Sequence, residues 1–341
     1  MKKIKVLSLF SGIGAFEKAL KNLDVDFELV NYCEIDKFAS YAYSVLHDIP
    51  ENLNLGDISK VNIKNIKDFD LLTYGFPCQD ISLAGKLKGI VKGETRSGLL
   101  FEALKIINDK KPKIAIAENV KNLVGKRFIN DFNSMIKELD YMGYNSYWSV
   151  INSKNYGIPQ SRERVFIVSI RKDIDKGTFK FNKPDTDFIK LSDILEDHVD
   201  KKYYIKNKYT KDFIRDINNK ICNNKNPNLF GLIRAGVLNN PNALDMNNRV
   251  FSIEGASPTI TTGSNSIPKI LECTVRKLTP LECWKLQGFT REDYIKVKQN
   301  LENKFYNGKD KTTTQMYKMA GNSITVQVVE NIIYNLLNIL S

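Results

Sequence analysis

The sequence is poor in the residues that build metal centres and disulfide frameworks. Its 341 residues include two histidines and five cysteines. None of the cysteines has CxxC spacing and their number is odd, which argues against a zinc site and for a reducing cytoplasm. His47 and His198 lie far apart among polar neighbours, so we expect both at the surface. We predict no metal site; the scattered cysteines are Cys33, Cys78, Cys222, Cys273 and Cys283.

Long apolar runs are also absent. No stretch approaches the roughly 20 apolar residues of a membrane span. Met1 leads straight into a strand-like run, without the apolar core of a signal peptide. The expectation is a cytoplasmic protein with no membrane partner. The length allows one large domain or two.

Acidic residues are outnumbered by basic ones. There are 51 Lys and Arg against 39 Asp and Glu, a formal net charge of +12. A basic excess favours a polyanionic partner such as nucleic acid. A Lys- and Asn-rich composition also follows from an AT-rich genome, so the charge alone leaves the partner open.

One cysteine stands in a distinctive setting, the stretch Asp70–Ser82. Its apolar start predicts a short buried strand that feeds Gly75. Pro77 fixes its own backbone angle, so Cys78 follows on a stiff bend. A thiol at the carboxyl end of a sheet strand is well placed for a nucleophile, because ligands of open α/β sheets bind there. The alternative is a buried structural cysteine, the commonest fate of a free thiol.

The N-terminal part of the chain predicts a βαβ unit. Its glycine turn, Gly12 and Gly14, lacks the third glycine of the dinucleotide fingerprint, and Glu34 lies about 20 residues further on, where it could bind ribose hydroxyls. Two glycines suit the binding of an adenosine without a pyrophosphate, and the ring of Phe10 would then form part of the floor of the adenosine pocket. The alternative is a plain strand–helix connection. The expected elements are strands at 4–10 and 27–33 and helices at 15–23 and 37–46.

Further polar residues follow predicted strands. Asp57 could accept from the exocyclic amine of a base or could be a turn or N-cap residue. Glu118 and Asn119 follow a strand at 113–117 and form a candidate acid/base pair with the Cys78 turn. Arg162 and Arg164 share one face if their segment is extended, with structural salt bridging as the alternative.

The rest of the chain is less regular. Residues 84–97 predict a loop that closes over a substrate, and helices are expected at 99–108 and 128–142, with strands at 144–151 and 165–170. From about 183 to 269 there is no clear α/β alternation. Thr279-Pro280 predicts a helix start, 300–317 a polar connection, and 326–340 a long amphipathic helix.

These stretches resemble, in order, the motifs of the bacterial cytosine-5 DNA methyltransferases. The family resemblance extends over nearly the whole chain outside its middle region. In circularly permuted relatives the last motif stands first in the chain. In this sequence it stands last. The six matching segments are LFSGIGAFE (9–17), GFPCQDIS (75–82), ENV (118–120), QSRERVF (160–166), RKLTPLECWKLQGF (276–289) and GNSITVQVVENI (321–332).

The resemblance implies transfer of a methyl group from S-adenosyl-L-methionine, leaving S-adenosyl-L-homocysteine. Cys78 matches the nucleophile that adds to carbon 6 of cytosine. Glu118 matches the residue that binds ring nitrogen 3, Arg164 and Arg162 the arginines beside the base, and Asn119 a residue that shapes the cysteine loop. The target cytosine would be flipped out of duplex DNA.

The same resemblance assigns the binding residues. Ile35 departs from it, because several relatives have an aromatic residue there, and Asp80 and Ile81 depart as well. The residues assigned to the cofactor are Phe10, Gly12, Gly14, Glu34, Ile35, Asp57, Ile58, Pro77, Leu100, Asn322 and Ser323. Those assigned to DNA are Gln79, Ser82, Thr259 and Ile260.

The predicted fold is α/β, with a Rossmann-like methyltransferase sheet and a second, smaller, irregular β-rich target-recognition domain. The catalytic domain would comprise residues 1–182 and 320–341, and the target-recognition domain with its hinge 183–319. We expect a monomer that binds double-stranded DNA, with any cognate restriction endonuclease acting separately. Two alternatives stay open, a tRNA cytosine-5 methyltransferase of the same superfamily and a non-catalytic nucleic-acid-binding module.

Overall fold

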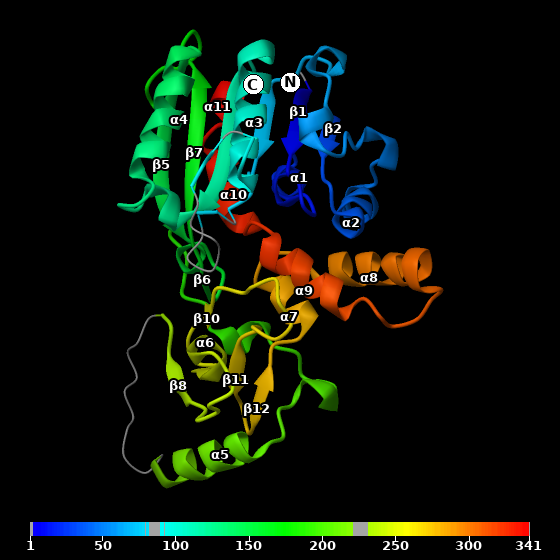
Figure 1. Ribbon diagram of the computed structural model, residues 1–341, viewed down its shortest axis with the longest axis vertical. Helices are drawn as coiled ribbons and strands as arrows, with labels where there is room; N and C mark the ends of the chain where they lie inside the picture. The colour runs from blue at the N-terminus through cyan, green and yellow to red at the C-terminus, as the bar shows by residue number, and fades with distance from the viewer. Residues whose placement is uncertain (1–2, 79, 82–88, 92, 221–230, 341) are drawn as a thin grey trace. The chain divides into compact units, whose positions relative to one another are not determined.

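The computed structural model describes residues 3–78, 80–81, 89–91, 93–220 and 231–340, which form two compact units (Figure 1). Unit 1 comprises Met1–Ile151, Glu163–Pro184 and Val326–Ser341, and unit 2 comprises Asn152–Arg162 and Asp185–Thr325. The unit boundaries differ from the expected domain boundaries at three places, because 152–162 and 320–325 fall in unit 2 and 183–184 fall in unit 1. Side chains from 160–162 bond to other segments of unit 2, which explains the first difference.

Unit 1 is built on a six-stranded sheet in the order β2-β1-β3-β4-β7-β5. The first four strands in this order are parallel to their neighbours, and β7 runs antiparallel to β4. This mixed α/β sheet confirms the predicted fold class. The strands are β1 (Ile4–Leu9), β2 (Phe27–Cys33), β3 (Leu71–Tyr74), β4 (Ile114–Val120), β5 (Tyr144–Asn152) and β7 (Glu163–Arg171).

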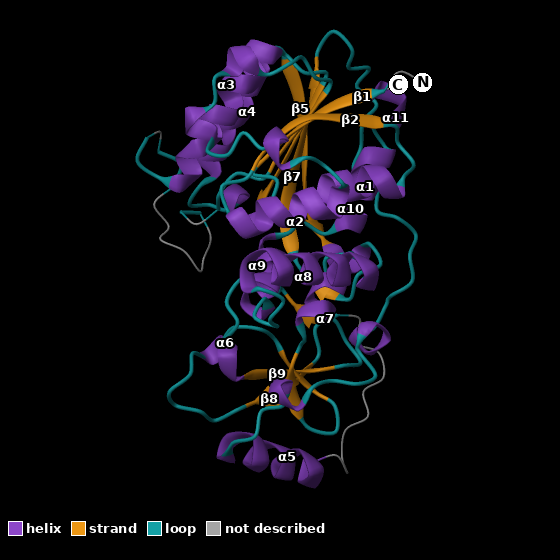
Figure 2. Ribbon diagram, turned by 90° about the vertical axis from the view of Figure 1, so that its right-hand side faces the viewer, coloured by secondary structure: helices purple, strands orange, loops and turns teal. Residues whose placement is uncertain are grey.

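Helices cover both faces of this sheet, as the two views show (Figures 1 and 2). Helices α3 and α4 pack on one face, where Leu72 and Ala115 of the strands join Leu104 and Phe132 of the helices in one apolar cluster. Helices α1, α2 and α10 lie on the other face, and α1 packs against α10. The helices are α1 (Ala15–Asn22), α2 (Lys37–His47), α3 (Leu100–Lys110), α4 (Ile129–Tyr141), α10 (Val326–Tyr334) and α11 (Leu337–Leu340).

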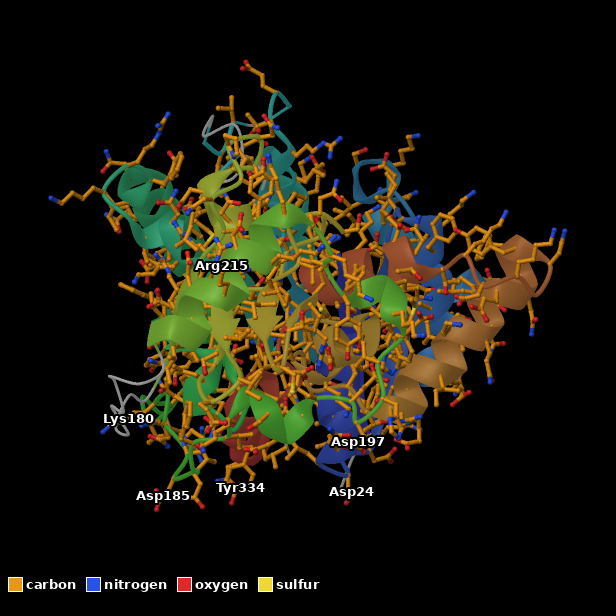
Figure 3. All side chains as sticks on the ribbon, turned by 90° about the horizontal axis from the view of Figure 1, so that it is seen from below. Asp24, Lys180, Asp185, Asp197, Arg215 and Tyr334 are labelled. Atoms are coloured by element: carbon orange, nitrogen blue, oxygen red, sulfur yellow. The ribbon has the colours of Figure 1, made fainter. Side chains whose placement is uncertain are left out.

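Unit 2 combines small sheets with helices. A four-stranded sheet has the order β12-β11-β9-β8, and β6 pairs with β10. Helix α5 packs on the larger sheet through Phe213, and its exposed Arg215 (Figure 3) pairs with Asp212. The strands are β6 (Gln160–Ser161), β8 (Arg234–Val237), β9 (Arg249–Ser252), β10 (Ser257–Pro258), β11 (Lys269–Leu271) and β12 (Val275–Lys277); the helices are α5 (Lys208–Lys220), α6 (Asp245–Asn248), α7 (Pro280–Lys285), α8 (Arg291–Tyr306) and α9 (Thr313–Asn322).

Two expectations about the C-terminal region are wrong. Residues 300–317 are not a polar connection, because α8 and α9 occupy most of this stretch. The single helix expected over 326–340 is instead two, α10 and α11. The expected start at Thr279-Pro280 is confirmed, since Thr279 caps α7 and Pro280 is its first residue.

Among the described residues, none of the helices has both the length and the apolar character needed to cross a bilayer.

Candidate active site

The order of the sheet places a ligand-binding edge beside β1. The chain passes from β1 to β2 on one side and later returns to β3 on the other side of β1. Ligands of open α/β sheets bind outside the carboxyl ends of the strands where the order reverses in this way. The glycine turn follows β1 and the Cys78 turn follows β3, so both predicted segments lie at this edge.

The Cys78 turn is held by hydrogen bonds on both sides of the cysteine. Asn119 Nδ2 donates to the Phe76 carbonyl at 3.0 Å, and Ser97 Oγ donates to the Pro77 carbonyl at 2.8 Å. Beyond the cysteine, Asn122 Nδ2 donates to the Ile81 carbonyl at 2.5 Å. The turn is therefore fixed by polar side chains of buried or half-buried residues. Asn119 contacts the turn that it is predicted to shape, and that role stays a prediction.

The cysteines differ in their surroundings. Cys33 and Cys283 are buried, whereas Cys78 is half-buried. Burial raises the pKa of the Cys33 thiol to about 12, so that sulfur stays protonated and inert. Cys78 is thus the partly accessible thiol at the sheet edge, as a nucleophile requires.

Glu118 and Arg164 lie together on neighbouring strands. Arg164 Nε is 3.0 Å from Glu118 Oε1, and the two side chains are 18% and 12% exposed. Glu118 Oε1 is buried, and its contact with Arg164 is an ion pair without hydrogen-bond geometry. Asn119, next to Glu118, holds the turn of Cys78. The cysteine, the carboxylate and the arginine thus belong to one end of the sheet.

Arg162 is placed differently from Arg164. It falls between β6 and β7, is only 3% exposed, and donates to the carbonyls of Ser323 at 2.7 Å and Gly321 at 3.3 Å. The segment is therefore not one continuous strand, and the two guanidinium groups have different partners. This geometry favours a positioning role for Arg162, and its assignment to the catalytic set stays a prediction.

The residues assigned to DNA that the structure describes lie against the same segment of unit 2. Thr259 Oγ1 donates to the Ser161 carbonyl at 2.8 Å, and the Ile260 amide donates to Gln160 Oε1 at 3.0 Å. Sequence reasoning missed the linking role of Gln160, whose Nε2 also donates to the Leu286 carbonyl. Their DNA contacts stay predictions, and Gln79 and Ser82 lie outside the described residues, as do 84–88 and 92 of the expected loop.

The glycine turn adopts a backbone that favours glycine. Gly12 and Gly14 have φ of 55° and 79°. A Cβ at Gly14 would lie 2.2 Å from His47 Nε2, whereas a Cβ at Gly12 would meet nothing within 4 Å. Gly14 thus serves packing, and Gly12 borders free space that can admit a ligand. Phe10 is held at a φ of 54°, an uncommon state for a residue with a side chain and one that clusters at functional sites.

His47 corrects one expectation. It is not at the surface but only 4% exposed, and its Nε2 lies 3.0 Å from the Ile13 carbonyl in the glycine turn. The apolar spacing of α2 turns it inward. His198 is exposed, as expected.

Glu34 is tied to the glycine turn and to the start of α2. Its Oε2 accepts from the Gly12 amide at 2.9 Å and its Oε1 from the Asp36 amide at 2.8 Å. Burial raises the pKa of Glu34, and the two backbone donors oppose that rise. Asn54, which no sequence signal indicated, fixes the Glu34 backbone through both its amide atoms.

The other residues assigned to the cofactor are placed less directly. Asp57 caps a short 3₁₀ turn by accepting from Ser59, which lowers the pKa of its carboxyl group. Ile35 is 76% exposed, whereas Ile58 and Leu100 are buried in the core. Asn322 and Ser323 are in unit 2, at the end of α9. Each of these assignments stays a prediction. The described residues contain no metal-binding cluster of His, Cys, Asp and Glu.

Comparison with known proteins gives a consistent result. The family model described as C-5 cytosine-specific DNA methylase matches residues 4–338. The chain is 32% identical over 450 residues to the orphan methyltransferase M.SPBetaI of Bacillus phage SPbeta, covering 99% of this chain and 98% of that protein. It is 30% identical to the type II methyltransferase M.HhaI of Haemophilus parahaemolyticus, with 98% and 94% covered.

Solved structures support the fold. The Entamoeba histolytica methyltransferase EhMeth matches with a TM-score of 0.71 at 17% identity, over 100% of both chains. The Dnmt2 methyltransferase of S. pombe matches with a TM-score of 0.67 at 18% identity, over 98% of this chain and 99% of that one.

Proposed function

Because the chain belongs to the C-5 cytosine-specific DNA methylase family, we propose that it transfers a methyl group from S-adenosyl-L-methionine to carbon 5 of a flipped-out cytosine in duplex DNA. The observation that carries this proposal is the half-buried Cys78 on a hydrogen-bonded turn, at the same sheet edge as the Glu118–Arg164 pair. Unit 2 would recognise the target sequence.

The residues at the glycine turn fit the methyl donor. The open space at Gly12 would take its adenosine part, and Glu34, whose carboxylate accepts from two backbone amides, would accept from ribose hydroxyls. Phe10 would border the same space, and the remaining residues assigned by resemblance would complete the contacts. When bound, the donor supplies a methyl group made electrophilic by its sulfonium.

The chain's own residues would make the cytosine reactive. The Cys78 thiolate adds to carbon 6, while Glu118 favours protonation at nitrogen 3 and Arg164 holds oxygen 2. The electron pair thereby released makes carbon 5 nucleophilic, and it takes the methyl group. Loss of the carbon 5 proton to a base and expulsion of the Cys78 thiolate restore the ring.

The test is methyl transfer from radiolabelled S-adenosyl-L-methionine to unmethylated duplex DNA and, in parallel, to tRNA. Wild type should label DNA. Cys78→Ala should lose the activity by at least ~10³-fold, since covalent catalysis cannot proceed without the thiolate. Cys273→Ala, which removes an exposed thiol of unit 2, is the matched control.

Two results would contradict the proposal. Undiminished transfer by Cys78→Ala would remove the covalent mechanism. Labelling of tRNA alone would assign the enzyme to the RNA-directed alternative, and the absence of any transfer by wild type would favour the non-catalytic module.

A further inference from the structure

Unit 2 contains a hollow of about 600 Å³ that the cysteine chemistry does not use. Segments 202–209 and 238–248 form much of its wall, together with residues of β11 and β12. Among the described residues, its lining includes four lysines, six asparagines and three tyrosines and no Asp or Glu. The hollow has the volume of a small-ligand site. Lys202 pairs with Asp200 and Asp310, so the positive charge of the hollow comes from its other three lysines. The lysines are Lys202, Lys206, Lys269 and Lys277.

Two of these lysines face each other without a compensating acid. Lys269 and Lys277 are directly opposite on the antiparallel strands β11 and β12, a position where like charges destabilise a sheet. Their Nζ atoms donate to backbone carbonyls, Lys269 to Asn247 and Lys277 to Ser264. Among the described residues neither forms a salt bridge. Lys269 is only 9% exposed, and burial and the charge of Lys277 lower its pKa.

The same hollow has a buried acceptor without a donor. Asn248 is 9% exposed, and its Nδ2 donates to the carbonyls of Asn240 and Ala243. These two carbonyls fix the orientation of the amide, because a flip would set oxygen against oxygen. Asn248 Oδ1 then has no hydrogen-bond partner among the described residues. A buried polar group left unpaired is destabilising and indicates a missing donor.

We infer that this hollow binds a nucleotide of the DNA substrate other than the target cytosine. Its phosphate accepts from the ammonium groups of Lys269 and Lys277, and the exocyclic amine of its base donates to Asn248. One ligand thus relieves the repulsion of the two lysines and satisfies the unpaired acceptor. The tyrosines of the wall offer ring faces for the base. This inference rests on the proposed function, because it takes DNA as the substrate.

The test is DNA binding by the full chain as a function of salt. Lys269→Gln and Lys277→Gln should each weaken the binding of an unmethylated DNA duplex by about tenfold at moderate salt. The slope of log K against log salt should become less steep by about 1, the change for one lost phosphate contact. Lys309→Gln, on an exposed lysine of unit 2, should match wild type in both respects.

A stability measurement separates this role from a structural one. Lys269→Met removes the repulsion and the buried charge, so it should raise the melting temperature while weakening DNA binding. If instead the variants bind DNA as wild type does, with the same salt slope, the inference is wrong. The same conclusion follows if deoxynucleoside monophosphate or inorganic phosphate binds this hollow as tightly as DNA does.

Failure of the inference and failure of the proposed function are distinguishable. The former leaves wild-type methyl transfer to DNA intact, whereas the latter abolishes that transfer in wild type.

Discussion

The first turn of α1, which follows the glycine turn, contains a buried carboxyl group. Glu17 is 1% exposed beside Ser8 and Tyr43, and burial raises its pKa. Because the pKa is raised on folding, the charged form destabilises the protein above that pKa, and the penalty vanishes below the unfolded value of about 4.5. The destabilisation caused by Glu17 therefore increases as the pH rises from about 4.5 through the pKa of Glu17 in the folded protein.

Glu17→Gln should then raise the melting temperature at pH 8 more than at pH 5. Thermal unfolding at both values measures this difference, with Glu28→Gln, on an exposed glutamate of unit 1, as the control. A stabilisation by Glu17→Gln that is equal at the two pH values would contradict this account of Glu17.

The position of an individual residue in the fold was predictable from sequence where its immediate neighbours determine it. Cys78 follows a short strand and a proline, so its place at a sheet edge could be derived from those neighbours. The side-chain partners of Arg162 could not be derived, because they come from residues roughly 100 and 160 positions away. His47 was expected at the surface because its sequence neighbours are polar, yet Gly14 leaves the space that its ring fills.

At the scale of elements, the junction of β12 and α7 depends on one buried ion pair. Arg276 and Glu282 have fully buried side chains and are joined by two hydrogen bonds of 2.8 and 2.9 Å. Glu282 Oε2 also accepts from the Thr279 amide, which completes the cap of α7. The carboxylate is therefore satisfied only while this group of residues stays together.

Arg276→Met should destabilise unit 2 by about 3–5 kcal/mol, because it leaves the Glu282 charge buried without its main partner. Chemical denaturation measures the loss. Arg276→Met combined with Glu282→Met should recover part of it, since the fully buried carboxylate is then removed too and only the partly exposed Glu272 loses its partner. Lys190→Met, which breaks the exposed pair with Glu254, should change stability by less than about 1 kcal/mol; equal losses from the buried and exposed pairs would contradict this account.

Elements were predicted best where apolar periodicity is strong. The expected strands at 4–10 and 27–33 agree with β1 and β2 within one residue. Helix α8 was missed although Thr290 and Asp293 form a capping box, because its buried residues are few, Val297 and Leu301. Helix α5 was missed because Lys, Asn and Asp dominate its sequence and tertiary packing through Phe213 holds it.

At the scale of the whole molecule, the order of elements along the sequence predicted the fold class but not the boundaries of the two units. The stretch without clear α/β alternation, expected from about residue 183, begins close to the start of the longer segment of unit 2 at Asp185. The short segment 152–162 joins unit 2 through contacts such as Thr259 with Ser161. Such contacts between distant segments leave no local signal in the sequence.

The net charge of +12 predicts that DNA binding by the whole chain depends on the salt concentration. If duplex DNA is the substrate, phosphate contacts release counterions, and log K should fall linearly with log salt. For about 6–10 contacts the loss between 50 and 200 mM salt is roughly 10³–10⁵-fold. Binding of S-adenosyl-L-methionine, measured by calorimetry over the same range, should change far less, because a small ligand releases few counterions. DNA binding that is independent of salt would contradict a phosphate-contacting surface, whatever residues it used.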